Sequence, residues 1–207
     1  MVRIIWILVC LLVSGSPVMG QDEVTDLAAE IESGNVVVNY LNGNGSSSGP
    51  ALEGQLHNIT QKVLRIATNL SRPLFLGNRG RDSGQNMIAV GVYGEGGAYY
   101  SDGENNFIEI QPNEIIPIQL TAYCADFDKD NPAYSDNFEI SEMPQEIADI
   151  AVKISRYVAA NPDLDLTVPS QIALWLSQGN SASDIQEKFP FSAADANIAK
   201  EIMSLPL

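Results

Sequence analysis

The sequence predicts an α+β fold, in which an antiparallel β-sandwich module is followed by a small helical module. Between residues 55 and 131, short runs rich in β-branched and aromatic residues alternate with Gly, Pro and Asn turn signals. From residue 132 to 207, apolar residues recur instead at the spacing of amphipathic helices. We therefore expect the β-sandwich module at 55–131 and the helical module at 132–207.

The first twenty residues have the composition of a secretory signal peptide. Arg3 precedes an apolar run at 4–13, and the small residues near Gly20 suit cleavage before Gln21. The run is short for a membrane span, although an uncleaved anchor remains the alternative. We expect a protein that is secreted or displayed at the cell surface.

Segment 21–54 is expected to stand before the sandwich as a separate N-terminal segment. Its residue pattern predicts a short helix at 22–33, a strand at 36–41 and a flexible loop rich in Gly, Asn and Ser at 42–50. Within the sandwich, the clearest strands are predicted at 63–67, 74–76, 87–93, 107–110 and 115–124, with a hairpin or bulged ribbon at 93–102.

Two prolines mark the predicted helices of the last module. Pro144 and Pro169 each open a helix, because proline at the first helical position sacrifices no hydrogen bond. The second helix is expected to end at Gly179. The first carries an apolar stripe formed by Ile147, Ile150, Ala151, Ile154 and Val158. Capping patterns that begin at Ser181 and Ser192 predict two more short helices.

The chain is acidic, with a formal net charge of −15. Nucleic acids and anionic lipids require basic patches, so neither is an expected partner. Beyond the leader, no apolar run is long enough to span a membrane. The expected partner is an extracellular protein or another surface amine.

Cys124 is the only cysteine outside the predicted leader, which contains Cys10. A single exported thiol cannot form an internal disulfide. It can instead be a packed small hydrophobe, a link between two copies, a nucleophile, or one half of an internal thioester. A second motif, at 170–175, bears on this choice, because it places Gln171 and Trp175 at the predicted start of a helix.

Tyr123-Cys124-Ala125-Asp126 and Ser170-Gln171-Ile172-Ala173-Leu174-Trp175 together resemble the thioester domains of bacterial surface adhesins. In that family, a Cys that follows an aromatic residue and a Gln at a helix start form an internal thioester. The resemblance implies that Cys124 and Gln171 form such a bond and that the protein is an adhesive module. Each thioester reacts once, so we expect no enzymatic turnover and no cofactor.

The chemistry of thioester formation sets requirements for this pair that do not depend on the resemblance. A thiolate must attack a carboxamide held at near-attack distance, and water must be excluded from the product. Gln171 in the first turn of its helix would lie near free backbone N–H groups that stabilise an oxyanion. Trp175, one turn later, and Tyr123 are expected to shield the bond. The thioester would then capture amines.

Two other functions stay open from the sequence. In one, the protein is a non-covalent extracellular binding module, and Cys124 is merely buried. In the other, it is a cysteine hydrolase with His57, the single histidine, as the base. Other candidates are a loose calcium site at Asp126, Asp128 and Asp130, and N-glycosylation of the sequons at Asn44, Asn58 and Asn69.

Overall fold

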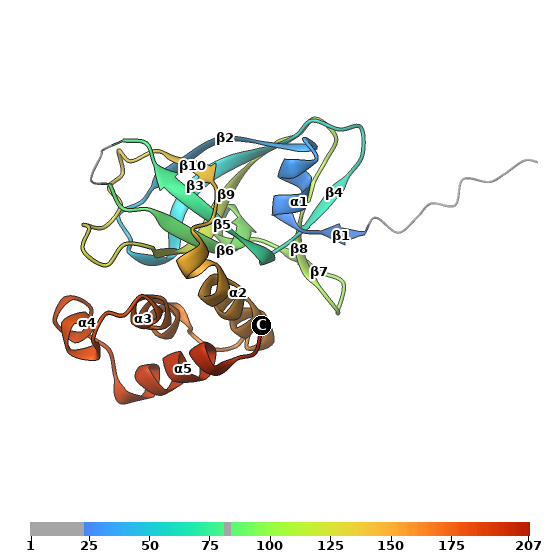
Figure 1. Cartoon of the computed structure of the whole chain (residues 1–207). Coiled ribbons are helices and arrows are strands. Elements are labelled where there is room, and N and C mark those ends of the chain that lie inside the picture. The colour runs from blue at the N-terminus through green and yellow to red at the C-terminus, as the bar shows by residue number, and fades with distance from the viewer. Residues whose placement is uncertain (1–22, 81–83) are drawn as a thin grey trace, which may run out of the picture.

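The computed structural model describes residues 23–80 and 84–207, so the predicted signal peptide lies outside the described residues. Two mostly antiparallel sheets occupy one side of the molecule, and the helices of the C-terminal part lie together on the other side (Figure 1). The predicted α+β class is confirmed.

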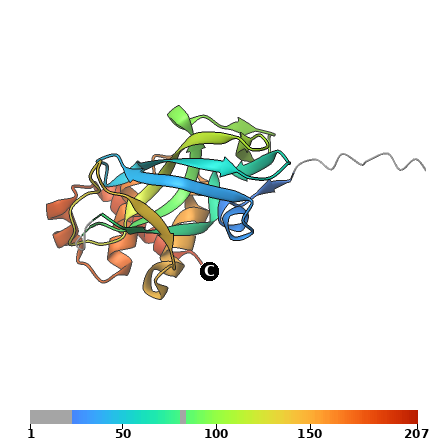
Figure 2. The ribbon, with the colours of Figure 1, turned by 90° about the horizontal axis from the view of Figure 1, so that it is seen from above.

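In the described part of the chain, six strands form the larger sheet in the order β10-β5-β6-β9-β3-β2, with every neighbouring pair antiparallel. The two edge strands approach each other through a bridge between Asn42 and Asn137, so the sheet curls almost into a barrel (Figure 2). Its members are β2 (Val36–Gly43), β3 (Ser48–Asn58), β5 (Asn69–Asn78), β6 (Met87–Gly94), β9 (Ile115–Cys124) and β10 (Phe138–Ser141).

The smaller sheet has four strands within the described residues, in the order β1-β4-β8-β7. These are β1 (Val24–Thr25), β4 (Leu64–Ala67), β7 (Tyr100–Ser101) and β8 (Asn106–Ile110). The turn at 111–114 does not close a hairpin, because β8 pairs in this sheet and β9 in the larger one. At 93–102 the chain forms a short 3₁₀ turn, η1 (Glu95–Gly97), and then β7.

The helices are α1 (Leu27–Glu32), α2 (Gln145–Ala160), α3 (Thr167–Ser177), α4 (Ala182–Lys188) and α5 (Ala193–Ser204). The apolar stripe predicted for α2 is confirmed, since Ile147, Ile150 and Ile154 are buried. Every residue of α3 from Pro169 to Trp175 is buried, which makes α3 the central helix of its module. A polar side chain on this stretch must therefore find its partner inside the protein.

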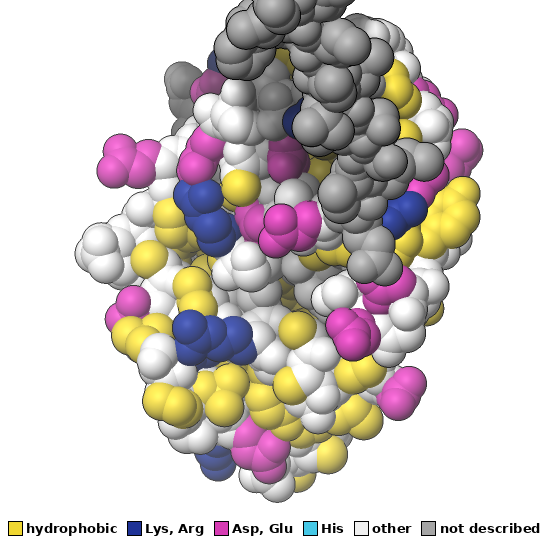
Figure 3. All heavy atoms as spheres, turned by 90° about the vertical axis from the view of Figure 1, so that its right-hand side faces the viewer, with side chains coloured by type: hydrophobic (Ala, Val, Ile, Leu, Met, Phe, Trp, Pro, Cys, Tyr) yellow, Lys and Arg dark blue, Asp and Glu magenta, His cyan; other side chains and the backbone are white. Residues whose placement is uncertain are grey.

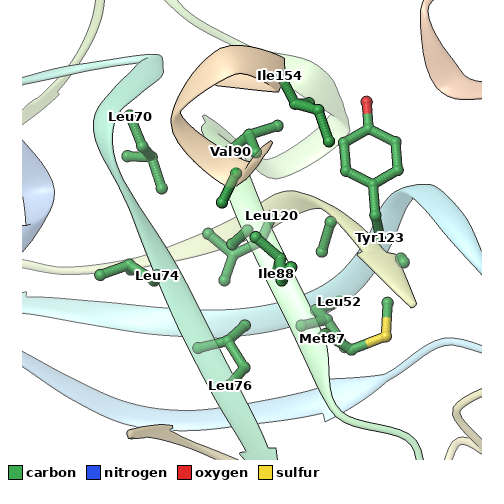
Figure 4. Packing of buried hydrophobic residues seen from close by; sticks show 14 of the residues in the cluster. Leu52, Leu70, Leu74, Leu76, Met87, Ile88, Val90, Leu120, Tyr123 and Ile154 are labelled. Atoms are coloured by element: carbon green, nitrogen blue, oxygen red, sulfur yellow. The ribbon is translucent and has the colours of Figure 1, made fainter. Parts of the chain in front are cut away.

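One hydrophobic core joins the sheets to the helices. Leu52 and Leu120 of the larger sheet belong to the same buried cluster as Ile154 of α2 and Leu174 of α3. Figure 4 shows part of this cluster, in which Ile154 lies over the side chains that rise from β6 and β9. Because one core spans both modules, we expect sheets and helices to unfold together.

The predicted boundaries inside the β part were wrong. Segment 21–54 does not stand apart from the sandwich. It contains β2 and the first part of β3, which are both strands of the larger sheet. Strand β3 begins at Ser48, inside the stretch expected to be a flexible loop, where Ser48 pairs with Tyr123 of β9. The helical part starts later than 132, since β10 still belongs to the sheet.

The surface in Figure 3 carries acidic side chains dispersed among uncharged and hydrophobic ones. This distribution is that of a solvated acidic surface rather than of a single charged patch. Within the described residues, no helix combines the length and the apolar composition that crossing a membrane requires.

The fold predicts a large effect at one of the sequons. Asn58 is fully buried, and its Nδ2 donates to the carbonyl oxygens of Lys62 at 2.7 Å and of Ile110 and Gln111 at 3.0 Å. Asn58→Ala would leave these acceptors without their donor, so we expect a loss of about 3 kcal/mol in the free energy of unfolding. Urea denaturation measures this loss.

Asn39→Ala is the matched control, because Asn39 is an exposed asparagine with no side-chain hydrogen bond in the described structure. It should change stability by less than about 0.5 kcal/mol. Equal stabilities for the two variants would contradict a structural role for Asn58.

Candidate functional site

The two motifs of the sequence meet where β9 ends against α3. Cys124 is the last residue of β9, which lies between β3 and β6 in the larger sheet. Gln171 lies among the buried residues of α3, and both residues are completely inaccessible to solvent. The strand end and the helix are thus held together in the interior of the protein.

Cys124 and Gln171 contact each other through two reciprocal hydrogen bonds. The backbone N–H of Cys124 donates to Gln171 Oε1 at 2.8 Å, and Gln171 Nε2 donates to the carbonyl oxygen of Cys124 at 2.9 Å. The Cys124 N–H also points at the carbonyl oxygen of Ser47, at 3.2 Å. The carboxamide therefore lies along the backbone of the residue that carries the thiol.

Further side chains bind the backbone just after Cys124. Gln178 Nε2 donates to the carbonyl oxygen of Ala125 at 2.7 Å. Gln85 pairs with Asp126 in both directions, with its Nε2 at 2.9 Å from the carbonyl oxygen and its Oε1 at 3.2 Å from the N–H. Three glutamines therefore fix the position of residues 124–126.

The sequence reasoning missed Gln85 and Gln178. Gln178 follows Gln171 by seven residues, which is two helical turns, so helical spacing alone would have placed both on one face. Gln85 lies just before β6, and no local pattern links it to the cysteine.

Burial governs the acidity of the thiol. Desolvation raises the pKa of Cys124 from 9.0 to about 12; a hydrogen bond from the Gln85 side chain lowers it, and the negative charge of Asp126 raises it. At neutral pH the sulfur is therefore a neutral thiol. Because it is buried and protonated, this thiol should resist alkylation in the folded protein whether or not it takes part in chemistry.

Trp175, one helical turn after Gln171, lies within a cluster of aromatic rings. Its ring meets those of Phe127 and Phe189 edge-on, with centroid distances of 5.3 Å and 5.6 Å, and the residue is only 5% exposed. Its Nε1 has no hydrogen-bond partner among the described residues. Trp175 also lines a hollow of about 320 Å³ together with Ser47 and Gln85, whose backbone and side chain flank Cys124.

Tyr123 does not share this position. Successive side chains of a strand point to opposite faces, so Tyr123 and Cys124 diverge. The Tyr123 ring extends from β9 toward the helices (Figure 4) and lines a different cleft from the one that Trp175 lines. Its placement does not support the predicted shielding of the sulfur by Tyr123, and shielding by Trp175 stays a prediction.

Helix α3 begins two residues before Pro169, where the sequence predicted its start. Its first residue is Thr167, whose N–H is bound by the Asp165 carboxylate at 3.1 Å, and the N–H of Ser170 already donates to Leu166 at 3.0 Å. Gln171 is therefore beyond the first turn. The N–H that faces its carbonyl oxygen belongs to Cys124 and not to the helix terminus.

His57 lies far from Cys124. It pairs with Ile115 at the start of β9, whereas Cys124 ends that strand nine residues later. At the rise of an extended strand this separation is about 30 Å. A Cys124–His57 dyad is thus not formed, and the histidine cannot act as the base of a hydrolase centred on this cysteine.

The aspartates considered for calcium have other partners. The carboxylate of Asp126 accepts two hydrogen bonds from Asn86, both at 2.9 Å, and pairs with Lys129 at 3.1 Å. The side chain of Asp128 is 93% exposed. Within residues 23–80 and 84–207, no group of three His, Cys, Asp or Glu side chains, Asp130 included, is arranged to hold a metal ion.

The three sequons differ in accessibility. Asn44 and Asn69 are half-buried. Asn58 is fully buried, and the nitrogen that would carry a glycan makes three hydrogen bonds. A glycan at Asn58 is not compatible with this fold, which corrects the prediction for that sequon.

Comparisons of the chain with models of known protein families, with curated proteins and with solved structures found no match. The geometry described above is therefore the basis for the functional argument.

The raised pKa predicts alkaline destabilisation of molecules that carry Cys124 as a free thiol. Below pH 9 the thiol is protonated in both the folded and the unfolded chain; between pH 9 and about 12 only the unfolded chain ionises. Stability is therefore lost as the pH rises through this window, by up to about 1.4 kcal/mol per pH unit. Urea denaturation at a series of pH values measures the slope.

Cys124→Ser is the matched control, because serine does not ionise in this range and Tyr123, whose pKa is also raised to about 12 by burial, is retained. The variant should lose less stability than the free-thiol protein between pH 9 and 12. Parallel curves would show that the buried thiol does not have the raised pKa.

Proposed function

We propose that the protein is a secreted or cell-surface binding module that captures amines covalently through a thioester between Cys124 and Gln171. The observation that carries the proposal is the pair of hydrogen bonds that holds the Gln171 carboxamide against the Cys124 backbone, in a site closed to water. Fixed neighbours in a dry interior are what formation and survival of a thioester require.

The reaction balances within this pair. The Cys124 sulfur attacks Cδ of Gln171, the thiol proton passes to Nε2, the C–N bond breaks, and ammonia leaves. The N–H of Cys124 already donates to Oε1, at 2.8 Å, so it can stabilise the negative charge that develops on this oxygen. After the reaction the same N–H can still donate to the thioester carbonyl.

Capture of a partner amine regenerates the Cys124 thiol. An amine attacks the thioester carbon, the C–S bond breaks, and one amine proton passes to sulfur. The side chain of residue 171 is then joined to the partner through an amide bond, and Cys124 is a thiol again. Each molecule reacts once, so the protein acts as an adhesive rather than through turnover.

A second function is favoured by a separate observation. Both hydrogen-bonding groups of the Gln171 amide are satisfied, and the pKa of the thiol is far above neutrality. The same contacts would therefore serve a purely structural clamp in a non-covalent binding module. The two functions differ in one bond, which mass spectrometry detects.

The first experiment measures that bond. The purified protein is unfolded in acid, digested, and searched for a Cys124 peptide joined to the Gln171 peptide with the loss of one ammonia. We expect the joined species, and we expect methylamine to separate it into a thiol peptide and an N-methylglutamine peptide. Peptide-level detection is needed because Gln21, as an N-terminus, can also lose ammonia.

Cys124→Ala should abolish the joined peptide. Gln178→Ala is the matched control, because Gln178 binds the next carbonyl oxygen along the same backbone and takes no part in the bond. If the unfolded wild-type protein instead shows only free Cys124 and unmodified Gln171, the thioester proposal is wrong and the structural clamp is supported.

Hydrolysis of the thioester would leave glutamate at position 171, so Gln171→Glu reproduces the hydrolysed protein. Its carboxylate would face the carbonyl oxygen of Cys124, which now accepts a hydrogen bond from Nε2 at 2.9 Å. We expect Gln171→Glu to lose about 3 kcal/mol of stability at pH 7. Urea denaturation measures the loss.

Part of this loss should return as the pH falls, because the protonated carboxyl can donate a hydrogen bond to that oxygen. Gln178→Glu should lose less, because Gln178 is exposed to solvent. A Gln171→Glu protein as stable as the wild type at pH 7 would contradict the tight amide geometry on which the proposal depends.

A further inference from the structure

A second concave site lies where the β part meets the link between α2 and α3. It is a cleft of about 270 Å³, which we call the tyrosine cleft because Tyr93, Tyr99 and Tyr123 line it. Its opposite wall is the segment 161–167. None of its lining residues belongs to the hollow beside Trp175, so it is a separate site from the candidate thioester.

The chemistry of the tyrosine cleft excludes anionic ligands. Among its lining residues there is no Lys, Arg or His, and Asp165 is the single carboxylate. A phosphate or carboxylate would lose water there without meeting a positive charge. The remaining polar groups are neutral amides and hydroxyls.

Several of these neutral groups have no partner within the protein. The side-chain amides of Asn69 and Asn106 and the hydroxyls of Tyr93 and Thr121 form no hydrogen bond among the described residues, and all four residues are half-buried. The Nδ2 of Asn161 donates to the Tyr157 carbonyl oxygen at 2.9 Å, which leaves its Oδ1 free. Polar groups in a concave surface without partners favour a ligand that both donates and accepts hydrogen bonds.

The aromatic rings supply the apolar contact. Tyr93 and Tyr99 meet edge to face with a centroid distance of 6.2 Å, and Tyr99 is 52% exposed. Burial raises the pKa of Tyr93, and that of Tyr123 to about 12, so both phenols stay neutral near pH 7. An exposed ring beside unpartnered amides can contact the C–H face of a ligand whose edges carry hydroxyl groups.

We propose that the tyrosine cleft binds a neutral saccharide unit. A sugar ring combines the required features: hydroxyls that donate and accept at its edge, an apolar face, and no charge. The cleft volume is just below the range of about 300–1,000 Å³ of small-molecule sites, which fits one sugar ring of a longer glycan. A cationic amine is the competing ligand, because it could use the tyrosine rings and Asp165, but it leaves the amide N–H groups without acceptors.

The test is saturation-transfer NMR on the Cys124→Ala protein, so that binding is measured without thioester chemistry. The protein is made in a host without N-glycosylation, which keeps Asn69 unmodified at the cleft. The probes are the methyl glycosides of glucose, galactose, mannose and N-acetylglucosamine, their β-1,4-linked disaccharides, and choline chloride. We expect transfer to the ring C–H protons of at least one glycoside and none to choline.

Tyr99→Ala should weaken binding of that glycoside at least tenfold, and Asn106→Ala should weaken it as well. Tyr100→Ala is the matched control, because Tyr100 is the neighbouring tyrosine, is 62% exposed, and stacks on Phe107 outside the cleft. No transfer to any glycoside, transfer to choline alone, or equal binding with and without Tyr99→Ala in the Cys124→Ala protein would each overturn the proposal. None of these results bears on the thioester.

Discussion

The reciprocal hydrogen bonds between Gln171 and Cys124 are the constraint on which the arrangement of the two modules depends. Gln171 lies in the stretch of α3 in which every residue is buried, so its amide has no access to water and must be satisfied by protein. The backbone N–H and carbonyl oxygen of Cys124, the last residue of β9, supply both partners. An amide left unpaired there would cost about 1–3 kcal/mol for each lost group. The pairing therefore fixes both the depth and the rotation of α3 against the larger sheet.

The same contacts that dock the helix also prepare the proposed chemistry. They hold the carboxamide against the backbone of the residue that carries the thiol, and both residues are closed to water. The exclusion of water has opposite effects on the formation of the thioester and on its survival. It raises the pKa of the thiol to about 12 and so slows formation, whereas it protects the product from hydrolysis. An intramolecular reaction that happens once can be slow, provided that the product lasts.

Local patterns were enough to predict the fold class, the stripe of α2 and the capping of the last helices, because each depends on residues close in sequence. The expectation that Cys124 and Gln171 belong to one site came from two short motifs. The start of α3 was missed because Asp165 binds the N–H of Thr167 before Pro169 is reached. Two other features depend on contacts between distant segments, which no local pattern encodes. They are the binding of Asp126 by Gln85 and the strand pairing of residues 48–50.

The end of β9 places two different surfaces side by side. The Tyr123 side chain lines the tyrosine cleft, while the backbone of the next residue, Cys124, is hydrogen-bonded to the Gln171 side chain. A neutral ligand bound in the cleft would contact the residue next to the thiol and the segment that leads into α3. A ligand bound there would therefore contact both elements that the reciprocal hydrogen bonds join, the end of β9 and the start of α3. One rigid strand would in this way connect recognition of a neutral surface to covalent capture of an amine on it.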